Sequence, residues 1–405
     1  MTISTDVTAL DLPDLTLVGL DRDQQLAAIA DARTQHWLAK TMFGVAVTHY
    51  DDAVAVLRDR RFHSALSLIP ELQGIGDSGF ETSRRQSILS MEGEPHARLR
   101  RLVAKAFTPM AADALRPFMR SVINDLIDSV DPLGGGDFVE AICEPYPIPI
   151  ICELLGAPPQ DWRLFSDWAT NIFKIFNGTL AEDLPAVQQA GKELEQYVTA
   201  MIERRRNDPA DDLLSTMIAI EEAGDRLSTD ELIMMAEAVL MAGTDTTRNQ
   251  LACTMALFAT HPQQWAVLVD RPELASKAVE ESMRYLGAVR GTMRVASEPV
   301  EMRGVLFPQG TLVNIPLASA NRDDDHFDTP NVFDITAERT SVQMTFGSGV
   351  HYCLGAALAR AELQEALALL AERWPIFALA GDIEWKPETF GIWGPAKLPV
   401  RWTNS

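Results

Sequence analysis

The sequence predicts a mainly α-helical fold with a small β-rich lobe, for two reasons. First, apolar residues continue with helical character from Ser228 to about Thr260, where a His-Pro pair ends the stretch. A typical helix has only ~11–12 residues, and one that is apolar on nearly all sides is expected to run through the protein interior. Second, strand-like segments are confined to about 40–65, 290–320 and the C-terminus. We expect one domain over residues 1–405, helical in the remainder.

The N-terminal quarter supplies the first part of the β-rich lobe. Residues 43–49 alternate and are β-branched, which predicts a strand, and residues 50–62 then predict a helix capped near Asp51. Residues 64–94 are irregular and rich in glycine and serine. A loop of this length is uncommon without a function, so we expect it to cover a cavity.

Helices dominate the rest of the chain. Helical periodicity occupies 95–130, and prolines divide 137–160 into short pieces. The aromatic residues within 161–206 fit either core packing or an apolar lid. Ser228 and Glu231 form an S-x-x-E capping box that begins the long central helix. Two further helices are expected at 272–287 and about 354–373.

Composition excludes several classes of protein. The 405 residues include 35 Lys+Arg and 57 Asp+Glu, a formal charge of −22. That charge disfavours nucleic-acid binding, because a phosphate backbone requires a basic surface. No segment reaches the ~18 apolar residues that cross a bilayer, and the acidic N-terminus does not fit a signal peptide. We expect a cytoplasmic protein with no nucleic-acid or membrane partner.

Cys353 stands apart from the other cysteines. Cys143, Cys152 and Cys253 have apolar neighbours and are expected to be buried as small hydrophobic residues. Cys353 lies among glycines just before an Ala/Leu-rich helix. Because a helix N-terminus lowers a thiol pKa, Cys353 is a candidate thiolate, although a structural cysteine remains an alternative.

The residues around Cys353 follow the pattern F-x-x-G-x-x-x-C-x-G, with Phe346, Gly349, Cys353 and Gly355 at the fixed positions. In this respect the chain resembles the cytochrome P450 family, and the resemblance extends over about residues 40–405. It implies a cytochrome P450 fold and a haem b whose iron is ligated by the Cys353 thiolate. A thiolate ligand pushes electron density to iron and favours O–O cleavage.

The central helix contains Ala242-Gly243-Thr244-Asp245-Thr246-Thr247, a run of poor helix formers. The Thr246 hydroxyl is expected to bond back to the Ala242 carbonyl, and the small residues at 242–243 to leave a groove for a diatomic ligand. The residues alone also allow a buried aspartate capped by threonines. The resemblance implies instead that Asp245 is the acid and Thr246 the alcohol of a proton relay.

Further residues match the family position by position. Glu281 and Arg284 form an E-x-x-R pair that Arg339 is expected to join in a structural role. The resemblance also implies four contacts to the haem propionates, which are His96, Arg100, Arg294 and His351.

By resemblance, a substrate pocket is lined by Ala238, Met241, Val289, Arg290 and Ile392, with parts of 64–94 and 165–180. Most of these residues are apolar, which favours a hydrophobic organic substrate. Arg290 is the exception. Either it pairs with a carboxylate or other acceptor on the substrate, or it points to a propionate or to solvent.

The resemblance implies a monooxygenase that hydroxylates or epoxidises an apolar substrate. Electrons would come from NAD(P)H through a ferredoxin reductase and a ferredoxin, because the chain has no flavin or nicotinamide motif of its own. Arg98, Arg101 and Lys105 could form a docking patch for the acidic donor, or simply a solvated helix face. We expect a monomer. A peroxide-driven enzyme and a non-catalytic haem protein for gas sensing or ligand storage remain alternatives.

Overall fold

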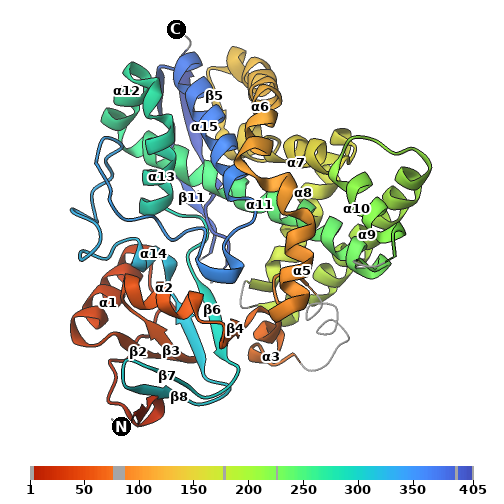
Figure 1. The fold of residues 1–405 in the computed structure, drawn as a ribbon. Helices are drawn as coiled ribbons and strands as arrows, with labels where there is room; N and C mark the ends of the chain where they lie inside the picture. Colours follow the sequence, from red (N-terminus) through yellow and green to blue (C-terminus); the bar gives the residue numbers. More distant parts are fainter. Residues whose placement is uncertain (1–3, 76–86, 177–178, 225–226, 388–390, 404–405) are drawn as a thin grey trace.

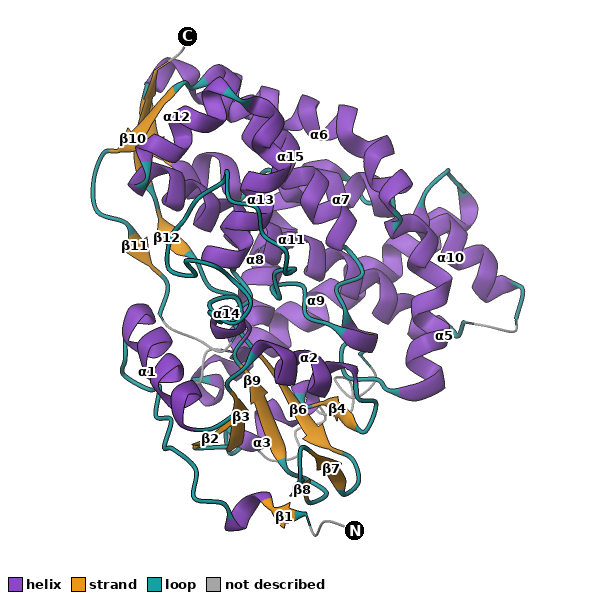
Figure 2. Cartoon of the chain, turned by 60° about the vertical axis from the view of Figure 1, so that its left-hand side comes forward, coloured by secondary structure: helices purple, strands orange, loops and turns teal. Residues whose placement is uncertain are grey.

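A computed structural model describes residues 4–75, 87–176, 179–224, 227–387 and 391–403. It confirms the mainly α-helical fold with a smaller β-rich lobe (Figure 1). The largest sheet lies at the opposite end of the molecule from α6, α7 and α15, as the view in Figure 2 also shows. The part of the 64–94 loop at 76–86 lies outside the described residues.

The helices cover most of the described chain. Their bounds are α1 Arg22–Gln35, α2 Tyr50–Arg58, α3 Ile69–Leu72, α5 Gly93–Val103, α6 Pro109–Val130, α7 Pro147–Leu155, α8 Trp162–Phe173, α9 Leu180–Asn207, α10 Leu213–Glu222, α11 Thr229–Thr260, α12 Pro262–Asp270, α13 Ala275–Tyr285, α14 Leu317–Ala320 and α15 Ala356–Arg373. Within the described segments, no helix combines the length and the hydropathy needed to cross a bilayer.

The largest sheet has the strand order β2-β3-β9-β6-β4, so it joins the two β-rich regions expected near residues 40–65 and 290–320. Its strands are β2 Leu38–Thr41, β3 Gly44–Val47, β9 Leu312–Ile315, β6 Thr292–Ala296 and β4 Phe62–Ser64. Within this sheet, only the β3–β9 pair is parallel. Because β6 pairs with β4, Arg294 lies opposite Ser64 in the register.

Three smaller sheets complete the β structure. They are β1-β8-β7, β10-β13-β5 and β11-β12, with the bounds β1 Thr5–Asp6, β5 Gly135–Asp137, β7 Val300–Met302, β8 Val305–Phe307, β10 Ile376–Leu379, β11 Glu384–Trp385, β12 Pro395–Lys397 and β13 Pro399–Thr403.

The central helix α11 fulfils the sequence prediction closely. The Ser228 hydroxyl accepts from the Glu231 N–H, the Glu231 carboxylate accepts from the Ser228 N–H, and the helix ends at Thr260. It packs against α7, α8, α13 and α15, which surround it in Figures 1 and 2. Because α11 is central, most of its side chains lie in the protein interior.

The helix after β3 begins differently from the expectation. Its N-cap is His49, without a side-chain cap, and Asp51 lies inside the first turn. The carboxylate of Asp323, distant in sequence, accepts from the Tyr50 N–H at 2.7 Å. The predicted cap was wrong because a tertiary contact supplies the acceptor that a local side chain usually provides.

The E-x-x-R pair occupies the expected structural position on α13. The Nε and Nη2 atoms of Arg284 donate to Glu281 at 2.8 Å, and Arg339 donates to the same carboxylate at 2.9 and 3.2 Å. Arg284 also donates to the carbonyls of Asn321, Pro330 and Val332. This buried network fixes the irregular segment that leads to Cys353.

Candidate active site

The loop that carries Cys353 is held by its own backbone. The Cys353 N–H donates to the Phe346 carbonyl at 3.0 Å, and Gly347 and Gly349 adopt φ of +70° and +72°. A Cβ at Gly349 would collide with the Leu57 carbonyl, so only glycine fits there. At Gly355 a Cβ would meet no atom within 4 Å. The glycines of the pattern therefore differ in role: Gly349 seats the loop on α2, and Gly355 leaves space beside the cysteine.

Cys353 lies before the helix rather than in its first turn, because α15 begins at Ala356. As a residue Cys353 is partly exposed, but its thiol is surrounded closely enough that burial raises its pKa. The Gly355 N–H, Arg100 and Arg360 oppose this shift. The expected lowering of the pKa was wrong, because desolvation outweighs the local dipole. A bound metal ion reverses this balance, since a coordinating thiol loses its proton.

The Phe346 ring is held in place by a cation–π contact with Arg360. The Arg360 guanidinium lies 4.5 Å from the centre of the Phe346 ring. The same guanidinium is held by Glu280 on α13, at 2.6 and 3.1 Å. Phe346 and the Cys353 loop are thus tied to α13 and α15 together.

One face of α11 is open although the helix is otherwise largely buried. Ala238, Ala242 and Thr246 follow one another at four-residue spacing, so they share a face. Ala242 is exposed and the other two are partly exposed. The Thr246 hydroxyl donates to the Ala242 carbonyl at 2.7 Å, which confirms the predicted back-bond.

Gly243 has a different role from the one expected. A Cβ at this position would lie 2.8 Å from the Ile151 side chain on α7. The glycine therefore permits close packing of α7 against α11, and only Ala242 of the pair contributes to the open face.

Asp245 is buried and paired. Its carboxylate accepts from Arg248 on the next turn of α11, and both side chains are 5% exposed. The sequence reasoning did not identify Arg248. An arginine three residues after the acid is the signal that could have revealed it.

The four predicted basic side chains lie around Glu92 and the residues just before Cys353. The His96 and His351 rings lie 4.5 Å apart, and Arg100 donates to the Tyr352 carbonyl. Burial, with His351 and Arg100 nearby, lowers the pKa of His96 to about 4. Arg294 is 5% exposed, and burial lowers its pKa to about 10. The structure thus brings together all four predicted propionate contacts.

Arg294 has only neutral hydrogen-bond acceptors among the described residues. It donates to the Thr292 hydroxyl at 3.1 Å and to the Met293 carbonyl at 3.0 Å. A buried guanidinium without a bonded carboxylate is costly. The position therefore favours binding of an anion.

Glu92 is a member of this cluster that the sequence reasoning missed. Its carboxylate accepts from the Ser64 N–H at 2.6 Å and bonds to His351 at 2.9 Å. Although burial opposes ionisation, these hydrogen bonds hold the pKa of Glu92 below its usual value. The residue falls in the segment just before His96, and its contact with Ser64 of β4 could only be seen from the tertiary structure.

The predicted pocket residues come together in part. Val289 and Ile392 form an antiparallel bridge, and both are partly exposed. Gly391 lies against Phe176, because a Cβ there would be 2.6 Å from the Phe176 Cβ. Met241 is buried on α11. Segments near 176 and 392 therefore meet, as expected for a shared lining.

Arg290 is held by protein groups. Its guanidinium donates to Gln25 at 3.2 Å and lies 5.1 Å from the centre of the Trp393 ring. These contacts join α1 to the segment before β12. A role toward substrate stays a prediction.

The suggested donor patch is weaker than the sequence indicated. Arg98 pairs with Glu231 at the start of α11, and Arg101 pairs with Glu94 at 2.7 Å. Two of the three cations are thus matched by carboxylates, because α5 carries its own acid and faces another on α11.

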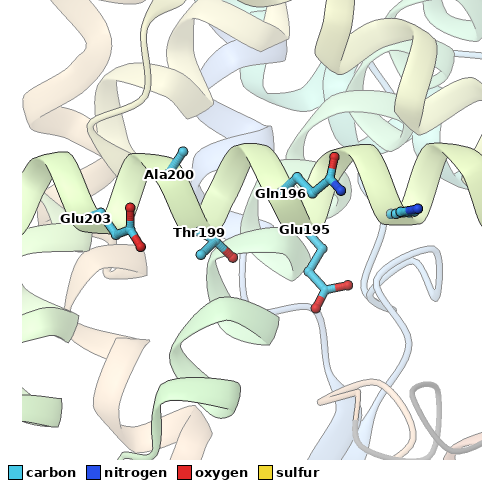
Figure 3. Close-up of a pocket in the computed structure, with 6 residues that line it drawn as sticks. Glu195, Gln196, Thr199, Ala200 and Glu203 are labelled. Carbon is cyan, nitrogen blue, oxygen red and sulfur yellow. The ribbon is translucent and has the colours of Figure 1, made fainter.

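A surface hollow of about 430 Å³ lies along α9, lined by Lys192, Glu195, Gln196, Thr199, Ala200 and Glu203. Figure 3 shows Glu195, Thr199 and Glu203 extending from this single helix. None of its lining residues belongs to the elements that carry Cys353, Asp245 or the four basic side chains, so it is separate from the site.

Glu362 is a buried acid on α15 that the sequence reasoning also missed. It is 1% exposed, and its Oε2 has no hydrogen-bond partner among the described residues. Burial raises its pKa to about 8, while a hydrogen bond with Thr247 of α11 opposes the shift. Glu362 is therefore protonated at neutral pH and helps to join α15 to α11.

Replacing Glu362 with glutamine should flatten the pH dependence of stability. The folded pKa lies above the unfolded value, so the contribution of the neutral acid is complete below about pH 4.5 and is lost as pH rises toward 8. At pH 8, E362Q should unfold at a higher temperature than wild type. The corresponding gain in the free energy of unfolding is on the order of a few kcal/mol at most. Melting curves at pH 5 and pH 8 measure this. E372Q, on the exposed side of α15, should keep the wild-type slope.

Comparisons with known proteins agree with this geometry. The sequence profile of the family described as Cytochrome P450 matches residues 162–270 and 268–393. Luteothin monooxygenase from Streptomyces thioluteus is 36% identical over 403 residues, which are 99% of this chain and 98% of that protein. Mycinamicin IV hydroxylase/epoxidase from Micromonospora griseorubida is 38% identical and covers 88% of this chain and 89% of its own length. The crystal structure of P450BioI in complex with a hexadec-9Z-enoic acid-ligated acyl carrier protein superimposes with a TM-score of 0.87 at 30% identity, over 94% of this chain and 99% of that one.

The family match and these relatives define an oxidoreductase that incorporates an atom of molecular oxygen. The chain belongs to the cytochrome P450 family, and it resembles bacterial monooxygenases within it over nearly all of its length.

Proposed function

We propose that this protein is a haem-thiolate monooxygenase in which Cys353 ligates the iron of haem b and an apolar small molecule is hydroxylated or epoxidised. The observation that carries the proposal is Arg294, a buried guanidinium that bonds only to neutral acceptors among the described residues. It lies near Glu92, which bonds to His351. Haem propionates are carboxylates, and arginine is suited to binding them in a bidentate manner.

The residues present fit a haem. Cys353 supplies a thiol with the Gly355 N–H directed to its sulfur, and Gly355 adds no side chain beside it. Ala242 leaves part of one face of α11 open. The contacts of Phe346 with Arg360 and of Gly349 with Leu57 hold the Cys353 loop in place. When bound, the haem supplies the binding and reductive activation of O₂, which thiolate donation to iron favours.

The chain's own residues would move protons during turnover. One oxygen atom enters the substrate and the other leaves as water, which consumes two electrons and two protons. Thr246 presents a hydroxyl on the open face of α11, and Asp245 lies one residue earlier as the acid. We assign the Thr246 hydroxyl, which donates to the Ala242 carbonyl at rest, to turn its O–H into the site during turnover, and Asp245 to restore its proton.

The substrate would bind among the apolar residues Ala238, Met241, Val289 and Ile392. The names of the relatives support an organic natural product, since they include a luteothin monooxygenase and a mycinamicin IV hydroxylase/epoxidase. A ferredoxin and its NAD(P)H-dependent reductase are proposed as the electron donors. The single-domain organisation and the monomeric state stay predictions.

A two-stage experiment tests the function. The ferric holoprotein is titrated with steroids, terpenes, fatty acids and macrolides, and a compound that displaces water from the iron shifts the spin-state spectrum. That compound is then offered with NADPH, a ferredoxin reductase and a ferredoxin, or with peroxide alone. We expect oxidised product chiefly with the donor system. Product with peroxide only would indicate a peroxide-driven enzyme, and spectral binding with no product would indicate a ligand-storage protein.

A further inference from the structure

Arg248 immobilises the acid that the proposed function uses. It is 4% exposed and bonds to the Asp245 carboxylate. Ser166 and Thr170 on α8 accept from the same guanidinium at 3.2 and 3.3 Å. A carboxylate bonded in this way to a buried cation cannot turn toward Thr246 until the cation has another partner, because an unpaired buried charge is costly.

A second carboxylate lies on the other side of Arg248. Glu144 follows the π-helical turn Val139–Cys143, and its Oε1 lies 3.9 Å from Arg248 Nη1. Its side chain is 38% exposed, in contrast to 5% for Arg248 and Asp245. The separation is too long for a hydrogen bond but short enough that a small movement of the guanidinium would form one. Arg248 therefore lies between Asp245, to which it is bonded, and Glu144, to which it is not yet bonded.

A second cation in this cluster is Lys386. Its ammonium donates to the Asn249 side chain at 2.7 Å. Burial lowers the pKa of Lys386, with Asp245 and Glu144 opposing and Arg248 adding to the shift. Two cations thus lie beside Asp245 and Glu144, and the neighbouring carboxylates Asp137 and Glu140 also act on Glu144. Burial raises the pKa of Glu144, whereas Arg248 and Lys386 favour its ionised form.

We propose that Glu144 is a positioning residue that receives Arg248 when Asp245 turns toward Thr246. In one arrangement Arg248 holds Asp245. In the other it bonds to Glu144, remains within reach of Ser166 and Thr170, and leaves the Asp245 carboxylate free to relay a proton. A second arrangement of this kind is populated only if both have comparable free energies, and in each of them Arg248 keeps one bonded carboxylate. The inference rests on the proposed function of Asp245.

Removing the charge of Glu144 tests this role in turnover. E144Q has the same shape but cannot stabilise the released Arg248, so Asp245 should stay locked. We expect product per NADPH to fall roughly tenfold, within the range of coupling between linked groups. The solvent isotope effect should rise, while the substrate spin-state titration stays unchanged. E153Q, which removes an exposed acid of α7, is the control. Equal coupling and equal isotope effects in the two variants would overturn the proposal.

A structure decides the question independently of activity. In D245N holoprotein the carboxylate that holds Arg248 is lost, so the Arg248–Glu144 separation should contract from 3.9 Å to hydrogen-bond distance, below about 3.2 Å. A crystal structure in which the separation is unchanged or longer would refute the switch, and it does so even if E144Q fails to fold. Absence of any NADPH-dependent product in wild type would instead contradict the proposed function.

Discussion

Replacing Cys353 with serine is expected to abolish oxygenation and the spectral signature of a thiolate-ligated haem. Loss of a second-sphere partner of a metal typically costs ~10–100-fold, so removal of the proposed ligand itself should exceed that range. The reduced carbonyl complex of the reconstituted variant should lose its thiolate-type band, and C353H should give a spectrum like that of a histidine-bound globin.

The other cysteines provide the control. Cys253 is fully buried on α11, and its sulfur donates to the Trp393 carbonyl at 3.6 Å. C253S preserves a donor at that place and should retain the thiolate band and the activity. A wild-type protein that gives a globin-like carbonyl spectrum in its native state, or a C353S variant that keeps the thiolate band, would remove the basis of the proposed function.

Replacing Thr246 with alanine is expected to uncouple reduction from oxygenation. A positioned proton donor typically contributes ~10²–10⁴-fold to the step that it assists, and the alanine variant retains the helix but not the hydroxyl. NADPH consumption should continue while peroxide rises and product falls. Measuring NADPH, peroxide and product in one reaction gives the coupling directly.

Thr244 distinguishes this role from a general effect on the helix. Its hydroxyl makes the same type of back-bond, to Leu240 at 2.6 Å, but the residue is fully buried away from the open face. T244A should remain coupled, and T246S should recover much of the coupling that T246A loses. Tight coupling in T246A would contradict the assignment.

Much of the candidate site could be predicted from local pattern. The back-bond from Thr246 to Ala242 spans four residues of one helix, and the Ser228–Glu231 capping box spans three, so the chain itself fixes these distances. The spacing of Phe346, Gly349, Cys353 and Gly355 is likewise local. The E-x-x-R pair was also local, although its link to Arg339 came from the family resemblance and not from geometry.

The predictions that were wrong, and the residues that were missed, involve groups far apart in the chain. Asp323 rather than Asp51 satisfies the first turn of α2, and Glu231 neutralises Arg98 across the molecule. The Ile151 side chain leaves no space for a Cβ at position 243, which explains the glycine there, and Glu92 forms a hydrogen bond with His351. In each case the deciding partner lies outside the local segment, where periodicity and spacing carry no information.

The sequence by itself determined the mainly α-helical fold class and the central helix, because helical periodicity depends on hydrogen bonds and side-chain spacing within each local segment. It singled out Cys353 through the resemblance of the surrounding motif. Only the tertiary structure decided the charge state of the site. Burial, which no local pattern reports, raises the pKa of Cys353 and Glu362 and lowers that of His96 and Arg294. The tertiary structure also places Arg248 between Asp245 and Glu144. A buried charge is stable only beside a counter-charge, and only the fold decides which residue supplies that counter-charge.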